Sequence, residues 1–286
     1  MSTVISVSGL HKSYGSNHAV AGIDLAIEQG EIFALLGPNG AGKTTTVEIL
    51  EGFRDRDSGS VQVLGFDPAT KGRAGQAWRD RIGIVLQSTH DAGDLTVFES
   101  VSHFAKYYEN PKDPHEVINL VGLTDKSSAL GRTLSGGQRR RLDVALGIIG
   151  APELLFLDEP TTGFDPEARR AFWALIQDLQ KSGTTILLTT HYLDEAEALA
   201  DRVAVINKGK IIEVATPELL GGRATSLATV SWKGANGLES ERTANPTDLI
   251  RKLTEIYKDE IPELTIKRAS LEDIYLEMIG GADVSE

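Results

Sequence analysis

The sequence contains no cysteine among its 286 residues. Disulfide bonds, thiolate metal sites and cysteine nucleophiles are therefore excluded, and a reducing cytosol is the expected compartment. Long hydrophobic runs are also absent, because even the apolar tract at residues 144–157 is broken by glycine, Pro152 and Glu153. A membrane-spanning helix needs about 20 apolar residues, so we expect no span. The first residues do not resemble a signal peptide.

A net basic charge is absent too. The chain carries 29 lysine and arginine residues against 41 aspartate and glutamate residues, a formal net charge of -12. Nucleic acids and acidic lipid surfaces attract a basic face, so we expect neither as a direct partner. A place at a membrane would require another protein to hold the chain there. The chain does have 41% hydrophobic residues, enough to fill a sizeable core.

Short apolar runs alternate with amphipathic helical patterns along most of the chain. Strands that are apolar throughout are typical of a parallel sheet covered by helices on both faces. The pattern predicts an α/β fold around a mostly parallel sheet. Alternating runs near the N-terminus instead indicate antiparallel strands at 4–7, 23–27 and 61–64. The expected strands of the main sheet are 32–37, 82–87, 154–158, 185–190 and 203–206, and the clearest helices are 44–51 and 166–180.

The same patterns divide the chain into a main domain, residues 1–220, and a small C-terminal α+β domain, residues 221–286. Residues from about 88 to 150 are mainly helical in pattern, which indicates a helical subdomain inserted into the main domain. In the small domain we expect a strand, a loop rich in glycine, asparagine and serine, a helix, a second strand and a last helix. The two strands are expected at 227–232 and 264–269, and the first of these helices at 247–259.

The segment GPNGAGKTT, residues 37–45, follows an apolar strand and precedes a helix. This is the spacing of a phosphate-binding loop, in which backbone N–H groups and the helix N-terminus face the phosphates of a nucleotide. Lys43 can then reach the β- and γ-phosphates, and Thr44 can bind Mg²⁺. The residues expected to contact ATP here are Gly37, Pro38, Asn39, Gly40, Ala41, Gly42, Lys43, Thr44 and Thr45.

Two adjacent carboxylates, Asp158 and Glu159, end the apolar run ELLFLDEP. In an open parallel sheet, ligands bind at this carboxyl edge of the strands. Asp158 can hold Mg²⁺, and Glu159 can orient or deprotonate an attacking water. Two carboxylates alone could be a solvated strand end, but together with the phosphate-binding loop they indicate a nucleoside triphosphatase.

The segment LSGGQ, residues 134–138, resembles the signature sequence of ABC-type ATPases. Other positions match the same family in order: Gln87 resembles its Q-loop glutamine, Asp165 lies in its D-loop, His191 resembles its switch histidine, and Tyr14 stands where an aromatic ring meets adenine. Taken singly, these residues could be a loop amide, a helix N-cap, a strand-end histidine and an ordinary aromatic residue. Their order along one chain favours the family.

The resemblance implies a P-loop ATPase that works as a head-to-tail dimer of two copies with two ATP molecules between them. Each ATP would lie on residues 37–45 of one copy and under Ser135, Gly136, Gly137 and Gln138 of the other, where a serine hydroxyl and glycine N–H groups form an anion site. The implied catalytic residues are Glu159, His191, Gln87 and Lys43; the implied Mg²⁺ ligands are Thr44, Gln87 and Asp158; and Tyr14 and Asp165 complete the nucleotide contacts.

Within this family the chain resembles the drug-resistance branch of bacterial exporters of the daunorubicin/doxorubicin type, although Phe164 replaces the more usual leucine. That branch pairs a soluble ATPase with a separate membrane permease. The resemblance implies an ATPase in the cytoplasm, bound to the inner face of the cell membrane through the permease, that energises efflux of a drug, antibiotic or lipid-like compound. An importer ATPase and a non-transport ABC ATPase remain alternatives.

Two further features were interpreted from the residues. Arg139, Arg140 and Arg141 point in three directions on a helical wheel, which favours solvated charges or salt-bridge partners over an arginine finger. Near the C-terminus, Ser270 and Asp273 are spaced as a capping box. The helix that follows has an apolar stripe that is either core or interface, and the family resemblance implies that this domain helps to hold two subunits together. The stripe is Leu271, Ile274, Tyr275, Met278 and Ile279.

Overall fold

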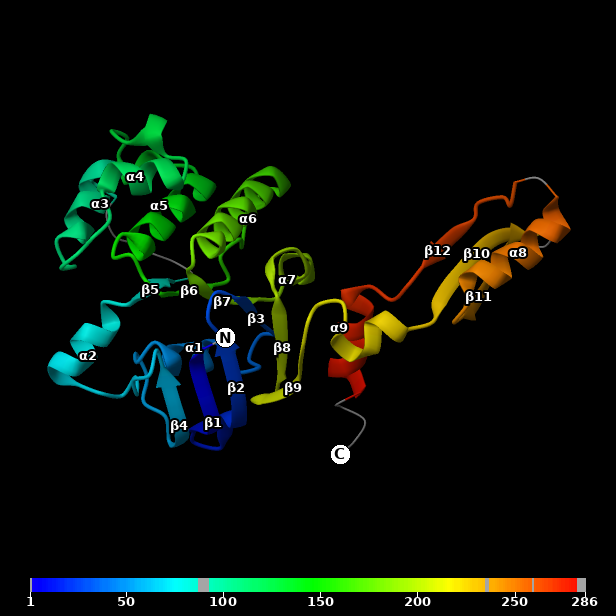
Figure 1. Cartoon of the computed structure of the whole chain (residues 1–286), viewed down its shortest axis with the longest axis horizontal. Helices are drawn as coiled ribbons and strands as arrows, with labels where there is room; N and C mark the ends of the chain where they lie inside the picture. The colour runs from blue at the N-terminus through cyan, green and yellow to red at the C-terminus, as the bar shows by residue number, and fades with distance from the viewer. Residues whose placement is uncertain (1, 87–92, 235–236, 259, 282–286) are drawn as a thin grey trace. The chain divides into compact units, whose positions relative to one another are not determined.

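The computed structural model describes residues 2–86, 93–234, 237–258 and 260–281. It separates into two compact units, Met1–Val214 and Ala215–Glu286 (Figure 1). The first unit contains the phosphate-binding loop, the paired carboxylates and the LSGGQ segment. The second unit has its own sheet and its own small core.

The centre of the first unit is a sheet with the strand order β5-β6-β7-β3-β8-β9. The pairings β5–β6, β6–β7, β3–β7 and β3–β8 are parallel, and β3 and β7 are buried along their whole length. The prediction of a mostly parallel sheet is therefore confirmed, whereas β9 was missed. The strands are β3 (Ile32–Leu36), β5 (Ile82–Val85), β6 (Leu154–Asp158), β7 (Thr185–Thr190), β8 (Arg202–Asn207) and β9 (Lys210–Ala215).

An antiparallel sheet, ordered β2-β1-β4, supplies the other wall of the core of the first unit. Its strands are β1 (Thr3–Tyr14), β2 (Asn17–Glu28) and β4 (Ser58–Val63), so β1 and β2 are longer than predicted. Buried side chains of both sheets form one cluster, in which Leu10 and Ile23 pack with Phe33 and Phe156. Helices α1 (Lys43–Leu50) and α2 (Gly72–Arg79) belong to the same unit.

Residues 93–150 contain helices and no strand of either sheet, as Figure 1 shows in green. Capping residues explain where these helices begin. Thr96 and Glu99 form a capping box at α3 (Val97–Ala105), Asp113 caps α4 (Pro114–Leu120), and Ser135 caps α5 (Gly136–Ile148). Short 3₁₀ turns lie at Thr124–Lys126 and Gly131–Thr133. Beyond this region, α6 (Pro166–Lys181) and α7 (Leu193–Leu199) follow β6 and β7.

The second unit is a small antiparallel sheet with the order β11-β10-β12 and helix α8 against it. Its core is Val230, Trp232, Leu249, Leu253 and Ile261. The elements are the 3₁₀ turn η3 (Leu220–Thr225), β10 (Ala228–Gly234), β11 (Gly237–Thr243), α8 (Pro246–Tyr257), β12 (Thr265–Lys267) and α9 (Leu271–Gly281). The prediction of a loop after the first strand was wrong, because β11 pairs with β10 there along its whole length.

The capping box at the start of α9 is confirmed. The backbone N–H of Asp273 donates to Ser270 Oγ at 3.1 Å, and the Ser270 N–H donates to Asp273 Oδ2 at 2.9 Å. Of the apolar stripe, Leu271, Ile274 and Tyr275 are buried. Within the second unit the Ile274 side chain lies directly against Gly221 of η3, which has the positive φ of 57° that favours glycine.

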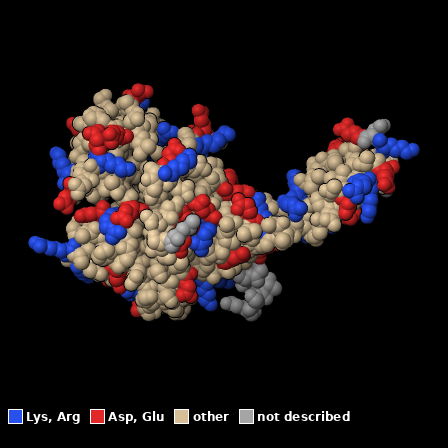
Figure 2. Space-filling view, in the orientation of Figure 1, with Lys and Arg blue, Asp and Glu red and all other residues tan. Residues whose placement is uncertain are grey.

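Acidic and basic side chains are interspersed over the face of the molecule in Figure 2. Among the helices that the structure describes, none is long and apolar enough for a membrane crossing.

Candidate active site

The phosphate-binding loop is packed tightly between β3 and α1. Gly42 has a φ of 104°, and a Cβ atom there would overlap the carbonyl oxygen of Ala19 in β2. A Cβ at Gly37 would likewise overlap the carbonyl oxygen of Ile206 in β8. Glycine is therefore required at both positions, since the loop backbone lies directly against two strands. The N-cap of α1, Gly42, makes no side-chain hydrogen bond to the helix start, so the first N–H groups of α1 remain available to an anion.

Lys43 lies inside this loop and is only 6% exposed. Its Nζ donates to the carbonyl oxygens of Gly37 at 2.8 Å and Pro38 at 3.2 Å, and lies 3.9 Å from Glu159 Oε1. Burial lowers the pKa of the Lys43 ammonium, against the opposing charges of Glu159 and Asp158. The positive charge of Lys43 thus lies inside the phosphate-binding loop, beside the Glu159 carboxylate.

A pocket of about 460 Å³ opens over the loop. Tyr14, at the end of β1, lies on its wall and is 42% exposed. Lys12 and Arg54 lie near the Tyr14 ring, at 5.6 and 5.4 Å from its centroid. An exposed ring beside a phosphate-binding loop can stack on a flat base. The pocket is lined by Tyr14, Asn17, Ala19, Asn39, Gly40, Gly42, Lys43, Thr44, Thr45 and Glu159.

Glu159 follows β6 with a left-handed backbone, φ 43°, which is unfavourable for any residue with a Cβ. Thr189 of β7 holds this turn: the Glu159 N–H donates to the Thr189 carbonyl at 3.2 Å and to its hydroxyl at 3.1 Å. The same hydroxyl donates to Asp158 Oδ1 at 2.5 Å. Thr189 therefore fixes the Asp158 carboxylate and the backbone of Glu159. The sequence analysis did not identify Thr189, although the two threonines at the end of β7 are visible in the sequence.

His191 completes the cluster at the carboxyl edge of the sheet. Its Nδ1 lies 3.2 Å from Glu159 Oε1, and its ring is 4.1 Å from that of Tyr192. The Glu159 side chain is only 14% exposed and faces both His191 and Lys43. Three residues that are far apart in the sequence, Lys43, Glu159 and His191, are thus brought together. A carboxylate held between a histidine and a lysine can act as a general base that accepts a proton from a water.

The LSGGQ residues have a different setting. Ser135 is exposed and begins α5, where its Oγ accepts from the Gln138 N–H at 3.3 Å and its N–H donates to Gln138 Oε1 at 3.0 Å. The Gln138 side chain is thereby engaged with its own helix. Gly136 is exposed, with open space where a Cβ would be, and Gly137 is partly buried near Ala168. The segment presents helix-start N–H groups to solvent, and the residues lining the pocket over Lys43 come from other segments.

Two other predicted site residues need comment. Asp165 is the N-cap of α6, where its Oδ1 accepts from the N–H groups of Glu167 at 3.0 Å and Ala168 at 2.8 Å. Phe164 beside it packs edge-on against Phe172, with ring centroids 5.6 Å apart. Gln87 lies outside the described residues.

The interpretation of the three arginines as solvated charges or salt-bridge partners is correct only in part for Arg140: it is buried, with 6% of its surface exposed, and its Nη1 lies 4.0 Å from Asp143 Oδ2. Its guanidinium donates to backbone carbonyls at the ends of β5 and β6. Arg139 and Arg141 are partly exposed. A helical wheel shows that three consecutive residues point in different directions, but it cannot show that one of these directions leads into the core.

The oxygen donors near the loop fit a magnesium ion. Thr44 is exposed beside the pocket and Asp158 ends β6, so a hydroxyl and a carboxylate are available. Mg²⁺ in nucleotide sites takes few protein ligands and completes its shell with phosphate oxygens and water. Across the described residues, no cluster of three or more acidic or histidine side chains could form a metal cage. The residues fit an ion that arrives with a nucleotide, where it would neutralise phosphate charge.

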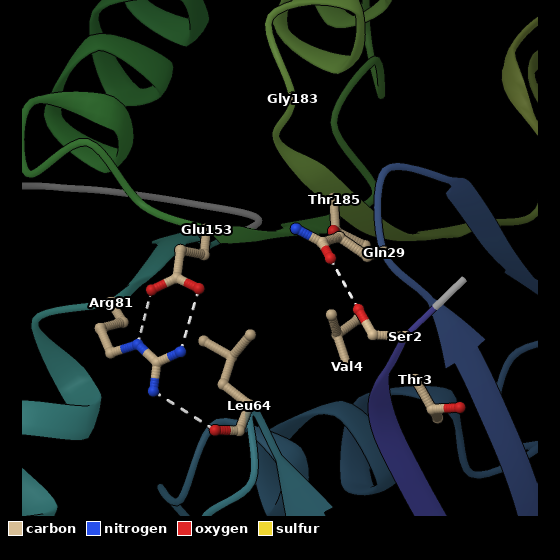
Figure 3. Close-up of a pocket in the computed structure, with 9 residues that line it drawn as sticks. All are labelled: Ser2, Thr3, Val4, Gln29, Leu64, Arg81, Glu153, Gly183 and Thr185. Atoms are coloured by element: carbon tan, nitrogen blue, oxygen red, sulfur yellow. Dashed lines mark hydrogen bonds and ion pairs between the residues drawn. The ribbon is translucent and has the colours of Figure 1, made fainter.

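Another hollow, of about 220 Å³, lies at the opposite edge of the main sheet (Figure 3). Arg81 and Glu153, which precede β5 and β6, lie together on one side of it and form a two-bond ion pair of 2.6 and 3.0 Å (Figure 3). The third nitrogen of Arg81 donates to the Leu64 carbonyl at 3.3 Å. All guanidinium nitrogens are therefore engaged, and this is the amino edge, where parallel sheets rarely bind ligands. We interpret the hollow as a structural joint between the two sheets.

A phosphate-binding loop, a strand ending in two carboxylates and a histidine beside them on one parallel sheet define a P-loop nucleoside triphosphatase. The comparisons with known proteins are more specific. The family model "ABC transporter" matches residues 20–162. The chain belongs to this family as an ATP-binding subunit.

The most similar relatives include two export or resistance proteins. The chain is 36% identical to "Nod factor export ATP-binding protein I" of Ralstonia nicotianae, over 97% of this chain and 94% of the relative. It is 35% identical to the "Daunorubicin/doxorubicin resistance ATP-binding protein DrrA" of Streptomyces peucetius, over 96% and 92%. Among solved structures, cbiO1 of Clostridium perfringens, part of the ABC transporter complex cbiONQ, matches with a TM-score of 0.70 and 30% identity, over 76% and 90%. The prediction of the ABC ATPase fold is confirmed.

Proposed function

We propose that this chain is the ATP-hydrolysing subunit of an ABC exporter, and that it energises efflux of a drug, antibiotic or lipid-like compound through a separate permease. The observation that carries the proposal is the Lys43–Glu159–His191 cluster over the phosphate-binding loop. Similarity to export and resistance proteins along nearly the whole chain supports export over import.

Each residue has a chemical role in this proposal. The loop and Lys43 hold the β- and γ-phosphates, Tyr14 meets the adenine, and Thr44 and Asp158 hold Mg²⁺. Glu159 orients the attacking water and takes its proton, because its oxygen is the one that faces the cradle. His191, whose Nδ1 lies 3.2 Å from Glu159 Oε1, contacts the γ-phosphate. The resemblance of Gln87 to the family's Q-loop glutamine supports it as a further Mg²⁺ ligand.

The functional unit is a head-to-tail dimer of two copies. Ser135 and Gly136 are exposed at the start of a helix, which supports their use as an anion site for the γ-phosphate of the other copy's ATP. Gln138 acts there by fixing the helix start, and Asp165 by fixing the segment that precedes α6. ATP then closes the dimer because it alone contacts both halves, and hydrolysis reopens it. Residues 221–286 form an accessory domain that helps to hold the copies together.

An apolar groove in the first unit is the proposed docking site for the permease. The groove has a volume of about 570 Å³, with Leu86 and Phe104 among its exposed apolar walls. At its edge Glu51 is only 6% exposed, and burial, with the negative charges of Asp158 and Glu48, raises its pKa to about 8. A cytoplasmic permease helix with an apolar face fits both features, because the raised pKa keeps the Glu51 carboxyl neutral near pH 7. Bound there, the chain would lie at the inner face of the cell membrane.

The decisive experiment compares the wild type with Glu159→Gln. We expect the wild type to release phosphate from MgATP and the variant to bind ATP without turnover. The variant should accumulate a closed dimer in size-exclusion chromatography with MgATP, since the closing contacts form but are not removed. Glu109→Gln, on an exposed carboxylate, is the control and should behave as the wild type. A variant that stays monomeric at saturating MgATP would contradict the shared sites.

A further inference from the structure

Arg140 connects the helix that begins at LSGGQ to the strand end that carries Glu159. Its Nε donates to the Pro160 carbonyl at 3.0 Å, and its Nη2 donates to the Asp158 carbonyl at 2.8 Å. Its Nη1 donates to the carbonyl of Leu86, at the end of β5. One buried side chain from α5 therefore contacts the ends of two strands of the main sheet.

The Asp158 and Pro160 carbonyls belong to the residues immediately before and after Glu159. Between them Glu159 has a φ of 43°. A left-handed backbone at a residue with a Cβ costs about 1–2 kcal/mol, and it persists only where the surroundings hold it. Thr189 binds the Glu159 N–H from one side, and Arg140 binds the neighbouring carbonyls. These contacts together keep the Glu159 carboxylate directed at Lys43 and His191.

The chemistry of arginine suits this place. Burial lowers the pKa of the Arg140 guanidinium, opposed by the charges of Asp143, Asp158 and Glu195. A buried charge is costly unless its hydrogen bonds are satisfied. The planar guanidinium has donors in several fixed directions and can therefore bind three carbonyls at once. A lysine ammonium is a compact point charge and could not reach all three. Because Arg140 lies on the first turn and a half of α5, its hold on β6 depends on where that helix lies.

We propose that Arg140 is a positioning residue for ATP hydrolysis: it holds Glu159 in its reactive backbone conformation and ties that conformation to the position of helix α5. The same helix begins with Ser135 and Gly136. A shift of α5 when these residues meet the partner's ATP is therefore transmitted to Glu159 of the same chain. This inference rests on the proposed function, since it requires Glu159 to act on the attacking water.

The first test compares Arg140→Gln with the control Arg141→Gln, which removes a neighbouring positive charge on a partly exposed side chain. A small displacement of a reacting group lowers turnover by about 100-fold, and we expect that loss in kcat for Arg140→Gln. The affinity for ATP should be unchanged, because Arg140 lies outside the pocket over Lys43. Arg141→Gln should keep wild-type kcat. Equal kcat values for Arg140→Gln and the wild type would overturn the inference.

A second test asks whether Arg140 acts through Glu159. Residues that act as a unit have strongly non-additive effects on kcat. The double variant Arg140→Gln, Glu159→Gln should therefore hydrolyse ATP no more slowly than Glu159→Gln alone. A further, multiplicative loss in the double variant would mean that Arg140 acts elsewhere. In addition, Arg140→Gln should accumulate the closed dimer in MgATP, a readout that general destabilisation would not produce.

Arg140→Lys covers the case in which the glutamine variant does not fold, which thermal unfolding would reveal. The lysine keeps the charge and can serve one carbonyl, so we expect a folded protein with a smaller loss of kcat. Wild-type turnover in this variant would also overturn the inference. A different result would contradict the proposed function itself: the wild type and Glu159→Gln would release phosphate at the same rate.

Discussion

The loop around Lys43 and the turn before helix α5 are held very differently by the same fold. The loop lies against β2 and β8, and its lysine is 6% exposed and bound to two carbonyls. Ser135 and Gly136 are exposed, and the contacts of the Ser135 side chain are with its own helix. In the proposed dimer, the first half of the site is therefore held within one chain, whereas the second half is a proposed anion site for the ATP of the other copy.

The largest expected effect comes from breaking the buried half. Lys43→Ala removes the cation from the cradle and leaves the Gly37 and Pro38 carbonyls without their donor. We expect the rate of ATP hydrolysis to fall by at least about 100-fold, the usual loss when a group that stabilises the developing charge of a transition state is removed. Phosphate release at saturating MgATP measures it. Lys210→Ala, on an exposed face of β9, should keep wild-type activity.

The exposed half can be broken without touching the first. Ser135→Arg places a bulky cation on the anion site, so hydrolysis should stop while binding of a fluorescent ATP analogue to the monomer stays intact. Weak nucleotide binding by this variant would mean that the segment belongs to the site of its own chain.

Mixing the two inactive variants sharpens the comparison. In a mixed dimer, the intact loop of the Ser135→Arg chain faces the intact LSGGQ turn of the Lys43→Ala chain. Half of the dimers are mixed and each has one whole site, so about one quarter of wild-type activity should return. Each variant alone serves as the control. A mixture as inactive as its components would exclude sites shared between chains.

The difference between the halves also explains what the sequence could predict. The loop before α1 and the capping box at Ser270 were identified because each is a short motif with a fixed spacing of residue types, and in the capping box the contacts themselves lie within three residues. Thr189 and Arg140 were missed because their partners are Asp158, Glu159 and Pro160, brought near only by the sheet and by packing of α5. The positive φ of Glu159 has no signal in the sequence for the same reason.

The stability of the first unit should depend on pH through Glu195 of α7. This carboxylate is fully buried, and its Oε1 accepts from Thr161 at 2.8 Å and Trp173 at 3.3 Å. Burial raises its pKa, despite those hydrogen bonds and the positive charge of Arg169. The ionised form is therefore disfavoured in the folded state. The contribution of Glu195 to stability must fall as pH rises above about 4.5, the ordinary value, through the raised pKa.

The variant Glu195→Gln isolates this effect because glutamine does not titrate. The free energy of unfolding of the wild type minus that of the variant should decrease as the pH rises above about 4.5, and should level off once the pH exceeds the raised pKa of Glu195. Urea unfolding at a series of pH values measures it. Parallel stability curves for the two proteins would show that Glu195 is ionised at its ordinary pKa.

The smallest effect separates the two roles of Ser135. Ser135→Ala removes the N-cap of α5 and should cost about 1 kcal/mol of unfolding free energy. Thr96→Ala removes the equivalent capping box of α3 in the same region and should cost about as much. Only Ser135→Ala should also slow ATP hydrolysis, because in the proposed dimer only that hydroxyl meets the partner's nucleotide. If both variants lost activity in proportion to stability, Ser135 would be a cap alone, and the exposed half of the site would consist of backbone N–H groups.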